Sequence, residues 1–587
     1  MRRQLLRHAA TALAVGLTLA WGVGAATASA TVPEQFQVWG KRAAADPYIG
    51  APDLAPAPLD TAGATAEETA RGFVLYAAQP SAVLRPDQAP AAGGRCSALD
   101  ARDCPGQYGP ATFSLFALAD GDFSVEVGDL SGKGGKIASD NLDVRAVRYA
   151  KVPAQNGPQT VPLLLESVGS VHVRAGCSQQ FWITYYVPPA QPAGAYEGAV
   201  RILKDGVRQA ELPLRLRVNG FTLAGPDEDL YIYYDSSTQP RDLGLVAKEL
   251  ADQRCHGMTV SGLTPPVTDD GELTREAWVP LLDTYKAAGF PSPRVYVSLW
   301  NRITSEWLNT TDKSIGMWGA WFRYYPFSAA LDERYIRTVR MMQEAAQERG
   351  LQIVLAVADE PGSHAWTIPA AQHYYDLVKA GAPSVTRELS VGGGWAMGQP
   401  EEELWRGRIN IWTTNRWLPE KLAAVRAGDP AAEIAIYNIG GPGSAAGGTQ
   451  PVRLFYGFVS WKARAGGAAQ WVYRHSGTPD HNYVWPAADP SEGRVPTMHW
   501  EAAREGAKDR RYVATLERML KGRSGPAADA ARRVLDEISA QVELSNTEYD
   551  PIAGGRIPAH PPGTYERWRS QIADAIEALQ AATGPGT

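Results

Sequence analysis

The stretch LQIVLAVADEP at residues 351–361 decides the fold class of this chain. Nearly all of its side chains are apolar up to Ala358, and the run then ends in Asp359 and Glu360. A short apolar run without alternation is typical of a strand that is buried on both faces, as in a parallel sheet covered by helices. We therefore expect a parallel strand at residues 352–359 with two carboxylates at its carboxyl end.

Similar stretches lie on both sides of this strand and alternate with predicted helices. The predicted strands are residues 230–235, 257–262, 294–299, 352–359, 386–392, 409–415, 433–438 and 468–475. Helical periodicity is clearest at 329–350, 452–465 and 497–520. Eight alternating strands and helices fit a closed (β/α)8 barrel. The rival is an open doubly wound sheet, but no GxGxxG phosphate loop follows the first strand.

The residues before the barrel predict an antiparallel β-sandwich. Short runs such as 111–116 and 180–187 show no helical period and are separated by turn residues such as those at 204–206. The fold class is therefore multi-domain, β followed by α/β. The expected boundaries are a signal peptide at 1–30, a linker or arm at 31–70, a β-sandwich at 71–224, the barrel at 225–524 and a C-terminal helical segment at 525–587.

Residues 1–30 have the layout of a secretory signal peptide. Arginines precede an apolar run at 9–26, and small residues at 28–30 form a cleavage site. The run is short for a retained membrane anchor. We expect export, to the medium or the cell envelope, and no membrane association after cleavage. The net charge of −6 and the lack of Lys/Arg clusters argue against a nucleic-acid partner.

The cysteines and the metal-ligand motifs indicate which disulfides and metal sites to expect. Cys96 and Cys104 lie in a Gly/Pro-flanked loop and are expected to form a short disulfide in an oxidising compartment. Cys177 and Cys255 are expected to be buried free thiols. Because neither CxxC nor HExxH spacing occurs, we expect no metal and no cofactor.

The candidate catalytic residues are Asp359 and Glu360, because catalytic groups of such barrels lie at the carboxyl ends of strands. Alternation along a strand should point the two side chains in different directions and so give them different pKa values. We expect Glu360, partly buried, to protonate a leaving glycosidic oxygen, and Asp359 to stay ionised. The alternative is that Asp359 caps the next helix and Glu360 is exposed.

The usual two-carboxylate mechanisms need a second acid across the scissile bond. The seventh strand, which often carries a nucleophile in barrel glycosidases, ends in Tyr437 and an asparagine, and Asp235 is the other strand-end acid. This pattern favours attack by a 2-acetamido group of the substrate, with Asp359 holding its N–H and Tyr437 donating to its carbonyl oxygen. A protein nucleophile such as Asp235 is the alternative.

Aromatic residues suggest a sugar-binding surface, since pyranose rings stack on indole and phenol rings. The chain has 18 Trp and 24 Tyr. The expected substrate-binding residues at loop-side positions are Trp300, Trp412, Trp417, Trp471, Tyr473, Tyr437, Arg474 and Asp235. Core packing is the alternative for several of the aromatic residues.

Several motifs carry a family resemblance. They are VADEP at 357–361, INIW at 409–412, WKARAGGAAQW at 461–471, REGAKDRRY at 504–512, FWI at 181–183 and PAGAYEG at 192–198. On these motifs, residues 71–520 resemble glycoside hydrolase family 123 and the related proteins with domain of unknown function 4091.

The resemblance implies an exo-acting β-N-acetylhexosaminidase, typically on N-acetylgalactosamine, that uses an Asp-Glu pair and the acetamido group of its substrate. Asp359 and Glu360 match that pair, whereas Tyr437 is assigned by position and matches no motif. The implied partner is a carbohydrate. A non-catalytic cell-envelope protein that binds glycans, or a scaffold whose sandwich contacts proteins, remains an alternative.

Overall fold

The computed structural model describes most of the chain after Thr31. The described residues are 32–44, 55–59, 63–89, 93–152, 159–225, 227–234, 238–267, 272–299, 325–361, 367–391, 401–415, 417–438, 448–475, 481–544 and 560–583. The predicted signal peptide, Asp235 and Trp300 lie outside them. Within these ranges, no helix is long and apolar enough to cross a lipid bilayer.

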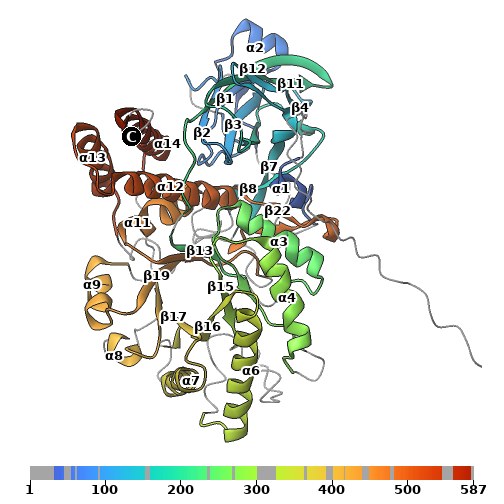
Figure 1. The fold of residues 1–587 in the computed structure, drawn as a ribbon. Helices are drawn as coiled ribbons and strands as arrows, with labels where there is room; N and C mark the ends of the chain where they lie inside the picture. Colours follow the sequence, from blue (N-terminus) through green and yellow to red (C-terminus); the bar gives the residue numbers. More distant parts are fainter. Residues whose placement is uncertain are drawn as a thin grey trace, which may run out of the picture. The chain divides into compact units, whose positions relative to one another are not determined.

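Two sheets form the N-terminal sandwich (Figure 1). The first, antiparallel sheet has the order β1 (Phe73–Ala77), β3 (Tyr108–Ala117), β10 (Ser178–Tyr186), β7 (Leu142–Val152) and β8 (Gln159–Glu166). The second has the order β2 (Leu99–Asp103), β12 (Val207–Val218), β11 (Gly194–Lys204), β4 (Gly121–Val127) and β9 (Val171–Val173), with β5 (Leu130–Gly132) and β6 (Gly135–Ile137) at its side. Alternating apolar residues from both sheets make one core, which includes Phe113, Phe181 and Leu214.

Eight parallel strands follow. In spatial order they are β14 (Gly262–Leu263), β15 (Arg294–Ser298), β16 (Gln352–Asp359), β17 (Thr386–Val391), β18 (Ile411–Thr414), β19 (Glu433–Asn438), β20 (Gly467–Gln470) and β13 (Asp229–Ile232). At the seam between β13 and β14, the backbone N–H of Thr259 donates to the carbonyl of Leu230 at 2.8 Å. The sheet is therefore a nearly closed barrel, and the predicted fold class is confirmed.

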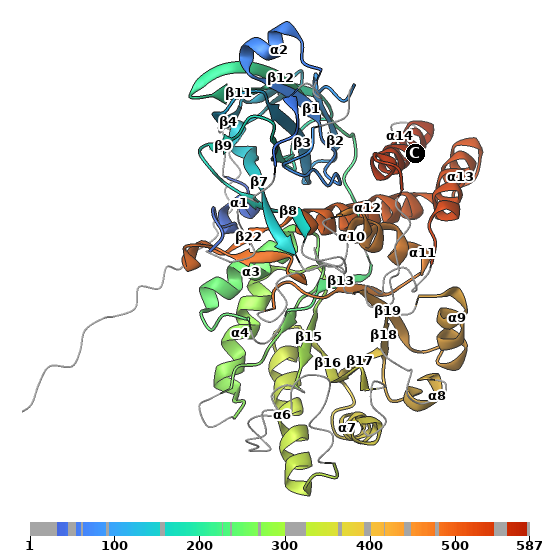
Figure 2. The same ribbon diagram turned by 180° about the vertical axis from the view of Figure 1, so that it is seen from behind.

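Helices alternate with these strands and surround them (Figures 1 and 2). They are α3 (Leu243–Cys255), α4 (Arg275–Ala288), α6 (Ala329–Gln347), α7 (Ile368–Gly381), α8 (Glu401–Trp405), α9 (Pro419–Gly428), α10 (Gln450–Leu454), a π-helical turn at Phe455–Val459, α11 (Ser460–Lys462) and α12 (Met498–Leu520). Between barrel and α12 lies a hairpin of β21 (Val484–Pro486) and β22 (Arg494–Pro496). The second predicted strand, 257–262, is wrong in position, since β14 begins only at Gly262.

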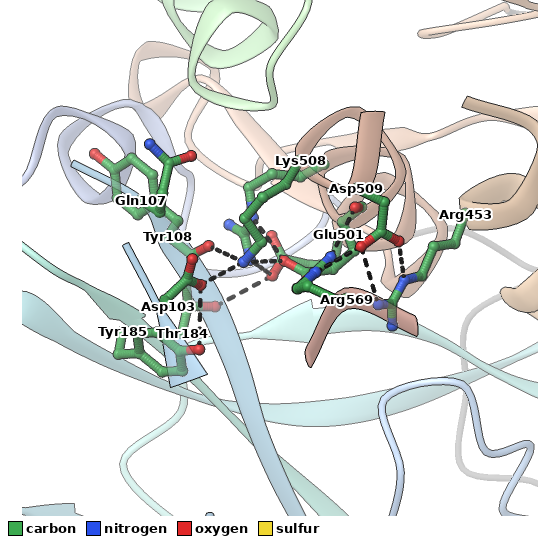
Figure 3. Close-up of polar contacts among 12 residues, drawn as sticks. Asp103, Gln107, Tyr108, Thr184, Tyr185, Arg453, Glu501, Lys508, Asp509 and Arg569 are labelled. Carbon is green, nitrogen blue, oxygen red and sulfur yellow. Dashed lines mark hydrogen bonds and ion pairs between the residues drawn. The ribbon is translucent and has the colours of Figure 1, made fainter. Parts of the chain in front are cut away.

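The final helices, α13 (Pro526–Gln541) and α14 (Thr564–Thr583), pack against α12. A buried cluster of charges joins α12 to β2 of the sandwich and to α14 (Figure 3). Its ion pairs are Lys508–Asp103 at 2.5 Å, Lys508–Glu505 at 3.0 Å, Arg569–Glu505 at 2.6 Å, Arg569–Asp509 at 2.5 Å and Arg453–Asp509 at 2.7 Å. We call these six residues the α12 charge cluster.

Close backbone contact brings the cluster together. A Cβ atom added at Gly506 of α12 would lie 2.6 Å from the carbonyl oxygen of Arg453. Glycine therefore lets α10 approach α12 closely enough for the Arg453 guanidinium to reach Asp509.

Part of the stretch expected as a linker or loosely packed arm is packed, whereas most of the described residues 55–59 and 63–70 are exposed. Residues 34–38 form α1 (Glu34–Val38), and Trp39 after it is buried. The indole N–H of Trp39 donates to Asp252 of α3 at 2.8 Å, and the Arg145 guanidinium lies 4.8 Å from its ring. A single large aromatic side chain thus fixes a segment that has no periodicity of its own. A second short helix, α2 (Ala66–Arg71), precedes β1.

The predicted disulfide between Cys96 and Cys104 is wrong. Both are free thiols, as are Cys177 and Cys255. Cys104 follows β2 into the interface with α12, where its Sγ contacts the hydroxyl of Tyr512 at 3.2 Å. Cys96 precedes the same strand and its Sγ lies near the carbonyl of Ala98. The intervening strand β2 holds the two thiols apart.

We predict that Asp509→Asn lowers the free energy of unfolding by about 3 kcal/mol, because it leaves the buried guanidinium groups of Arg453 and Arg569 short of one negative charge. Urea denaturation measures this loss. The matched control is Asp529→Asn on α13, which removes a carboxylate from an exposed pair with Arg532 and should cost less than about 0.5 kcal/mol. Equal losses for both variants would contradict the prediction.

Candidate active site

The carboxylates of Asp359 and Glu360 lie at the carboxyl end of β16, where the loops that follow the strands meet. Both side chains are half-buried. Among the described carboxyl ends of the barrel strands, only that of β16 carries carboxylates. In a parallel barrel this end faces the reaction space.

A β-bulge in β16 turns Asp359 toward the inside of the barrel. The register between β16 and β17 shifts just before Asp359, because β16 contains one extra residue there. Strict alternation from Val354, which packs inside the barrel, would point Asp359 outward at the helices. With the bulge, Val357 and Ala358 both pack under the helices and Asp359 comes beside Ser390 of β17.

Glu360 has a backbone conformation that non-glycine residues seldom adopt. Its φ is 41°, in the left-handed region. Its N–H donates to the carbonyl of Ser390 at 3.1 Å, and its carboxylate accepts a hydrogen bond from the hydroxyl of Tyr437. The sharp turn therefore brings Glu360 back over the barrel, on the same side as Asp359.

Burial raises the pKa of Asp359 to about 8, and repulsion from Glu360 and from Glu388 of β17 adds to the shift. With this raised pKa, the pair holds a proton at neutral pH.

The prediction that alternation points Asp359 and Glu360 in different directions is wrong. The bulge before Asp359 and the turn at Glu360 bring both side chains to the same side. The expectation that Asp359 stays ionised is wrong for the ligand-free protein. In that state the raised pKa of Asp359 keeps the shared proton on this residue.

Tyr437 lies inside the barrel beside the pair. It is 5% exposed, and its hydroxyl donates to Glu360. Its ring centroid is 6.4 Å from that of Tyr233, whose hydroxyl lies 3.2 Å from the Oγ of Ser390. Burial keeps the pKa of Tyr437 well above 10, so this phenol is a hydrogen-bond donor at all relevant pH values.

Trp471 follows β20 and is half-buried at the same end of the barrel. Its ring centroid lies 5.2 Å from that of His475 and 5.3 Å from that of His481. Its backbone N–H donates to the carbonyl of Asn438, the residue after Tyr437. Among the described aromatic residues predicted for sugar binding, Trp471 and Tyr437 are in place for it.

Three other predicted sugar-binding residues do not face the site. Trp412 is buried on the outer side of β18, among the helices, because its neighbours Ile411 and Thr413 take the inward positions. Trp417 packs against the ring of Phe455 at 4.9 Å. Tyr473 is buried behind the strands and donates to Asp252 at 2.8 Å. The prediction is wrong for Trp412, Trp417 and Tyr473.

Arg474 is half-buried just after β20. Burial and the nearby guanidinium of Arg494 lower the pKa of Arg474. Its side chain therefore lies close to other charged groups of the protein. Its carbonyl accepts a hydrogen bond from Thr238 at 2.7 Å. Asp235 and Trp300, the remaining predicted site residues, lie outside the described residues.

Sequence reasoning missed Glu388, Ser390 and Tyr233, which line the barrel beneath the pair. The signal was available for Glu388, because an acid in the middle of the otherwise buried strand TRELSV is unusual. Within the described ranges, no group of histidine, cysteine and acidic side chains has an arrangement suited to a metal ion.

Comparisons with known proteins bear on the fold. No protein-family model matches the chain, and no curated protein matches its sequence. Among solved structures, it is similar to a family 39 glycoside hydrolase from Bacteroides cellulosilyticus WH2 (13% identity, 70% of this chain and 81% of that one, TM-score 0.34) and to a family 5 xyloglucanase from Bacteroides ovatus (8%, 70% and 98%, TM-score 0.29). These TM-scores are too low to support an argument.

A third similarity is much more extensive. A family 123 glycoside hydrolase from Clostridium perfringens, studied for glycolipid glycan hydrolysis, matches 87% of this chain over 98% of its own length, with a TM-score of 0.60 and 11% identity. The match spans the sandwich and the barrel together. The fold of this chain is therefore similar to that of a family 123 glycoside hydrolase, as the sequence motifs implied.

Proposed function

We propose that this protein is an exported glycoside hydrolase, an exo-β-N-acetylhexosaminidase that retains configuration by using the 2-acetamido group of its substrate. The observation that carries this proposal is the placement of Asp359, Glu360 and Tyr437 on one side of the barrel mouth. The similarity of fold to a family 123 glycoside hydrolase supports a carbohydrate substrate.

The shared proton gives Glu360 its role. When the N–H of an acetamido group donates to Asp359, that hydrogen bond favours the ionised form of Asp359. The single proton of the pair then belongs on Glu360, which can give it to the leaving glycosidic oxygen. Substrate binding thus sets the protonation states that the sequence predicted for the pair.

The acetamido oxygen then attacks the anomeric carbon as the glycosidic bond breaks. The resulting oxazolinium ion carries positive charge, which ionised Asp359 stabilises at close range. The Tyr437 hydroxyl, which donates to Glu360 in the free protein, can turn to the acetamido carbonyl oxygen. In the second step, Glu360 deprotonates a water molecule, which attacks the anomeric carbon and opens the oxazolinium ring.

The rival mechanism needs a protein carboxylate as nucleophile. Asp235 is the candidate from the sequence. Because β19 ends in Tyr437 and Asn438 instead of an acid, the described part of the site favours the substrate-assisted route.

The decisive experiment is hydrolysis of aryl β-glycosides of N-acetylgalactosamine, N-acetylglucosamine and their 2-hydroxy counterparts. We expect turnover of the acetamido sugars alone, and a loss in kcat of about 10²-fold or more in Glu360→Gln. The matched control is Glu420→Gln on the exposed start of α9, which should keep full activity. Turnover of 2-hydroxy sugars would indicate a protein nucleophile, and no turnover by the wild type would favour a glycan-binding protein.

Tyr437→Phe tests the phenol while keeping its ring. We expect kcat to fall about 10-fold to 100-fold, because the site loses one hydrogen-bond donor to developing charge. Stability should change little, since the ring still packs against Tyr233. Steady-state kinetics and thermal melting measure both quantities; unchanged kcat would exclude the assigned role.

The pKa of Asp359 predicts the alkaline side of the pH profile. The pair keeps its one proton below the raised value of about 8 and loses it as the pH rises through that value. Because Glu360 needs that proton, kcat/KM should fall as the pH rises through about 8. A profile of kcat/KM against pH checks this. Constant activity up to about pH 10, well past the loss of the proton, would contradict it.

A further inference from the structure

Glu388 is an acid inside the barrel, one layer below the catalytic pair. On β17 it pairs in register with Ala356 of β16 and Ile411 of β18, while Ser390, two residues further, pairs with Asp359. Residues two apart on a strand face the same side, so Glu388 and Ser390 both face the inside of the barrel. Glu388 is 2% exposed.

Among the described residues, no cation compensates the charge of Glu388. No arginine, lysine or histidine there forms an ion pair with its carboxyl group, and its Oε1 has no hydrogen-bond partner. The hydroxyls of Thr413 on β18 and Ser390 face the carboxyl group. The other titratable groups around it are Tyr231 and Tyr233 of β13, Tyr296 of β15, Tyr375 of α7 and Asp359 of β16.

Only one of these neighbours titrates near neutral pH. The four phenols have pKa values well above 10 because they are buried, so they remain neutral. Asp359 is therefore the neighbour whose ionisation near neutral pH responds to the charge of Glu388.

Ser390 joins the two layers. Its Oγ lies 3.2 Å from the hydroxyl of Tyr233 and faces the carboxyl group of Glu388. Its carbonyl accepts the N–H of Glu360, and it stands beside Asp359 across the sheet. The contacts of one serine thus connect the buried acid to both members of the pair.

We propose that Glu388 is a positioning residue of the active site, a buried carboxyl group whose loss of a proton makes the Asp359–Glu360 pair hold its own proton more tightly. The proposal deepens the proposed function, on which its catalytic consequence rests. Burial without a counter-charge raises the pKa of Glu388 to about 7, just below that of Asp359. As Glu388 ionises, its negative charge opposes ionisation of Asp359 and keeps the general acid supplied with a proton.

The first test is independent of catalysis. Glu388→Gln, Asp359→Asn and the double variant are compared with the wild type by urea unfolding at about pH 5 and about pH 9, below and above both raised pKa values. At the lower pH both groups are neutral and the effects of the two changes should add. At the higher pH each single change removes the same repulsion, so the double variant should depart from additivity by about tenfold in the unfolding equilibrium constant.

The sign of the single-variant effect is also fixed. A carboxyl group with a raised pKa in the folded protein costs stability as the pH rises from its unfolded value through about 7. Glu388→Gln removes that cost, so its advantage over the wild type should grow with pH. Additive effects at both pH values would overturn the proposal.

Glu249→Gln is the matched control. Glu249 is an equally buried glutamate whose pKa is also raised to about 7, but it pairs with Arg494 and Tyr234 and is not among the groups that shift the pKa of Asp359. Combined with Asp359→Asn, it should show additive effects at both pH values. Coupling as large as that of Glu388 would mean that general damage to the fold is being measured.

The second test uses catalysis. In Glu388→Gln the alkaline limb of kcat/KM should move to lower pH by about half a unit or more, while kcat at the optimum stays within about tenfold of the wild type. If the alkaline limb of the kcat/KM profile does not move in Glu388→Gln, the proposed effect of Glu388 on catalysis is overturned. If no sugar is hydrolysed by the wild type, the proposed function fails, and the unfolding cycle still decides whether Glu388 and Asp359 are coupled.

Discussion

The α12 charge cluster is the interaction on which the rest of the structure depends. Its acids and bases come from β2 of the sandwich, α10 and α12 of the barrel, and α14. Each charge is buried, so each needs its partners, and those partners are complete only when all three parts of the chain are in place. The cluster therefore makes sandwich, barrel and C-terminal helices one structural unit.

The carboxyl groups at the barrel mouth differ from those of the α12 charge cluster in what surrounds them. In the α12 charge cluster every buried carboxylate faces cations, and the pKa of Glu505 is far below its usual range. At the mouth, no cation among the described residues lowers the pKa of half-buried Asp359 or of buried Glu388, and these pKa values are raised to about 8 and about 7. The acids at the barrel mouth therefore hold their protons, whereas the acids of the α12 charge cluster hold their charges. This difference distinguishes the candidate site from the scaffold of the barrel.

Most of the fold could be predicted from periodicity and apolar runs. The bounds of β16 and β19 were predicted to the residue, because both strands are continuous apolar runs with clear ends. The bulge before Asp359 could not be predicted, since it depends on pairing with β17. Trp412 and Tyr473 were misplaced for a similar reason: strand membership is visible in the sequence, whereas the side of the strand that a residue faces depends on the register.

Cys104 and Trp39 show a second limit. Both make their contacts with residues far along the chain, Tyr512 and Asp252, so local composition carried no sign of them. Glu388 is different, because a lone acid within a buried strand is visible in the sequence.

The left-handed backbone of Glu360 has an evolutionary consequence. An L-amino acid at φ 41° strains the chain by roughly 1–2 kcal/mol, and a glycine there would release that strain. Mutations to glycine at this position would therefore stabilise the fold, and under the proposed function they would remove the general acid. In a lineage no longer selected for that function, stability alone would favour glycine at position 360, and a glycine there would mark a descendant that has kept only the barrel.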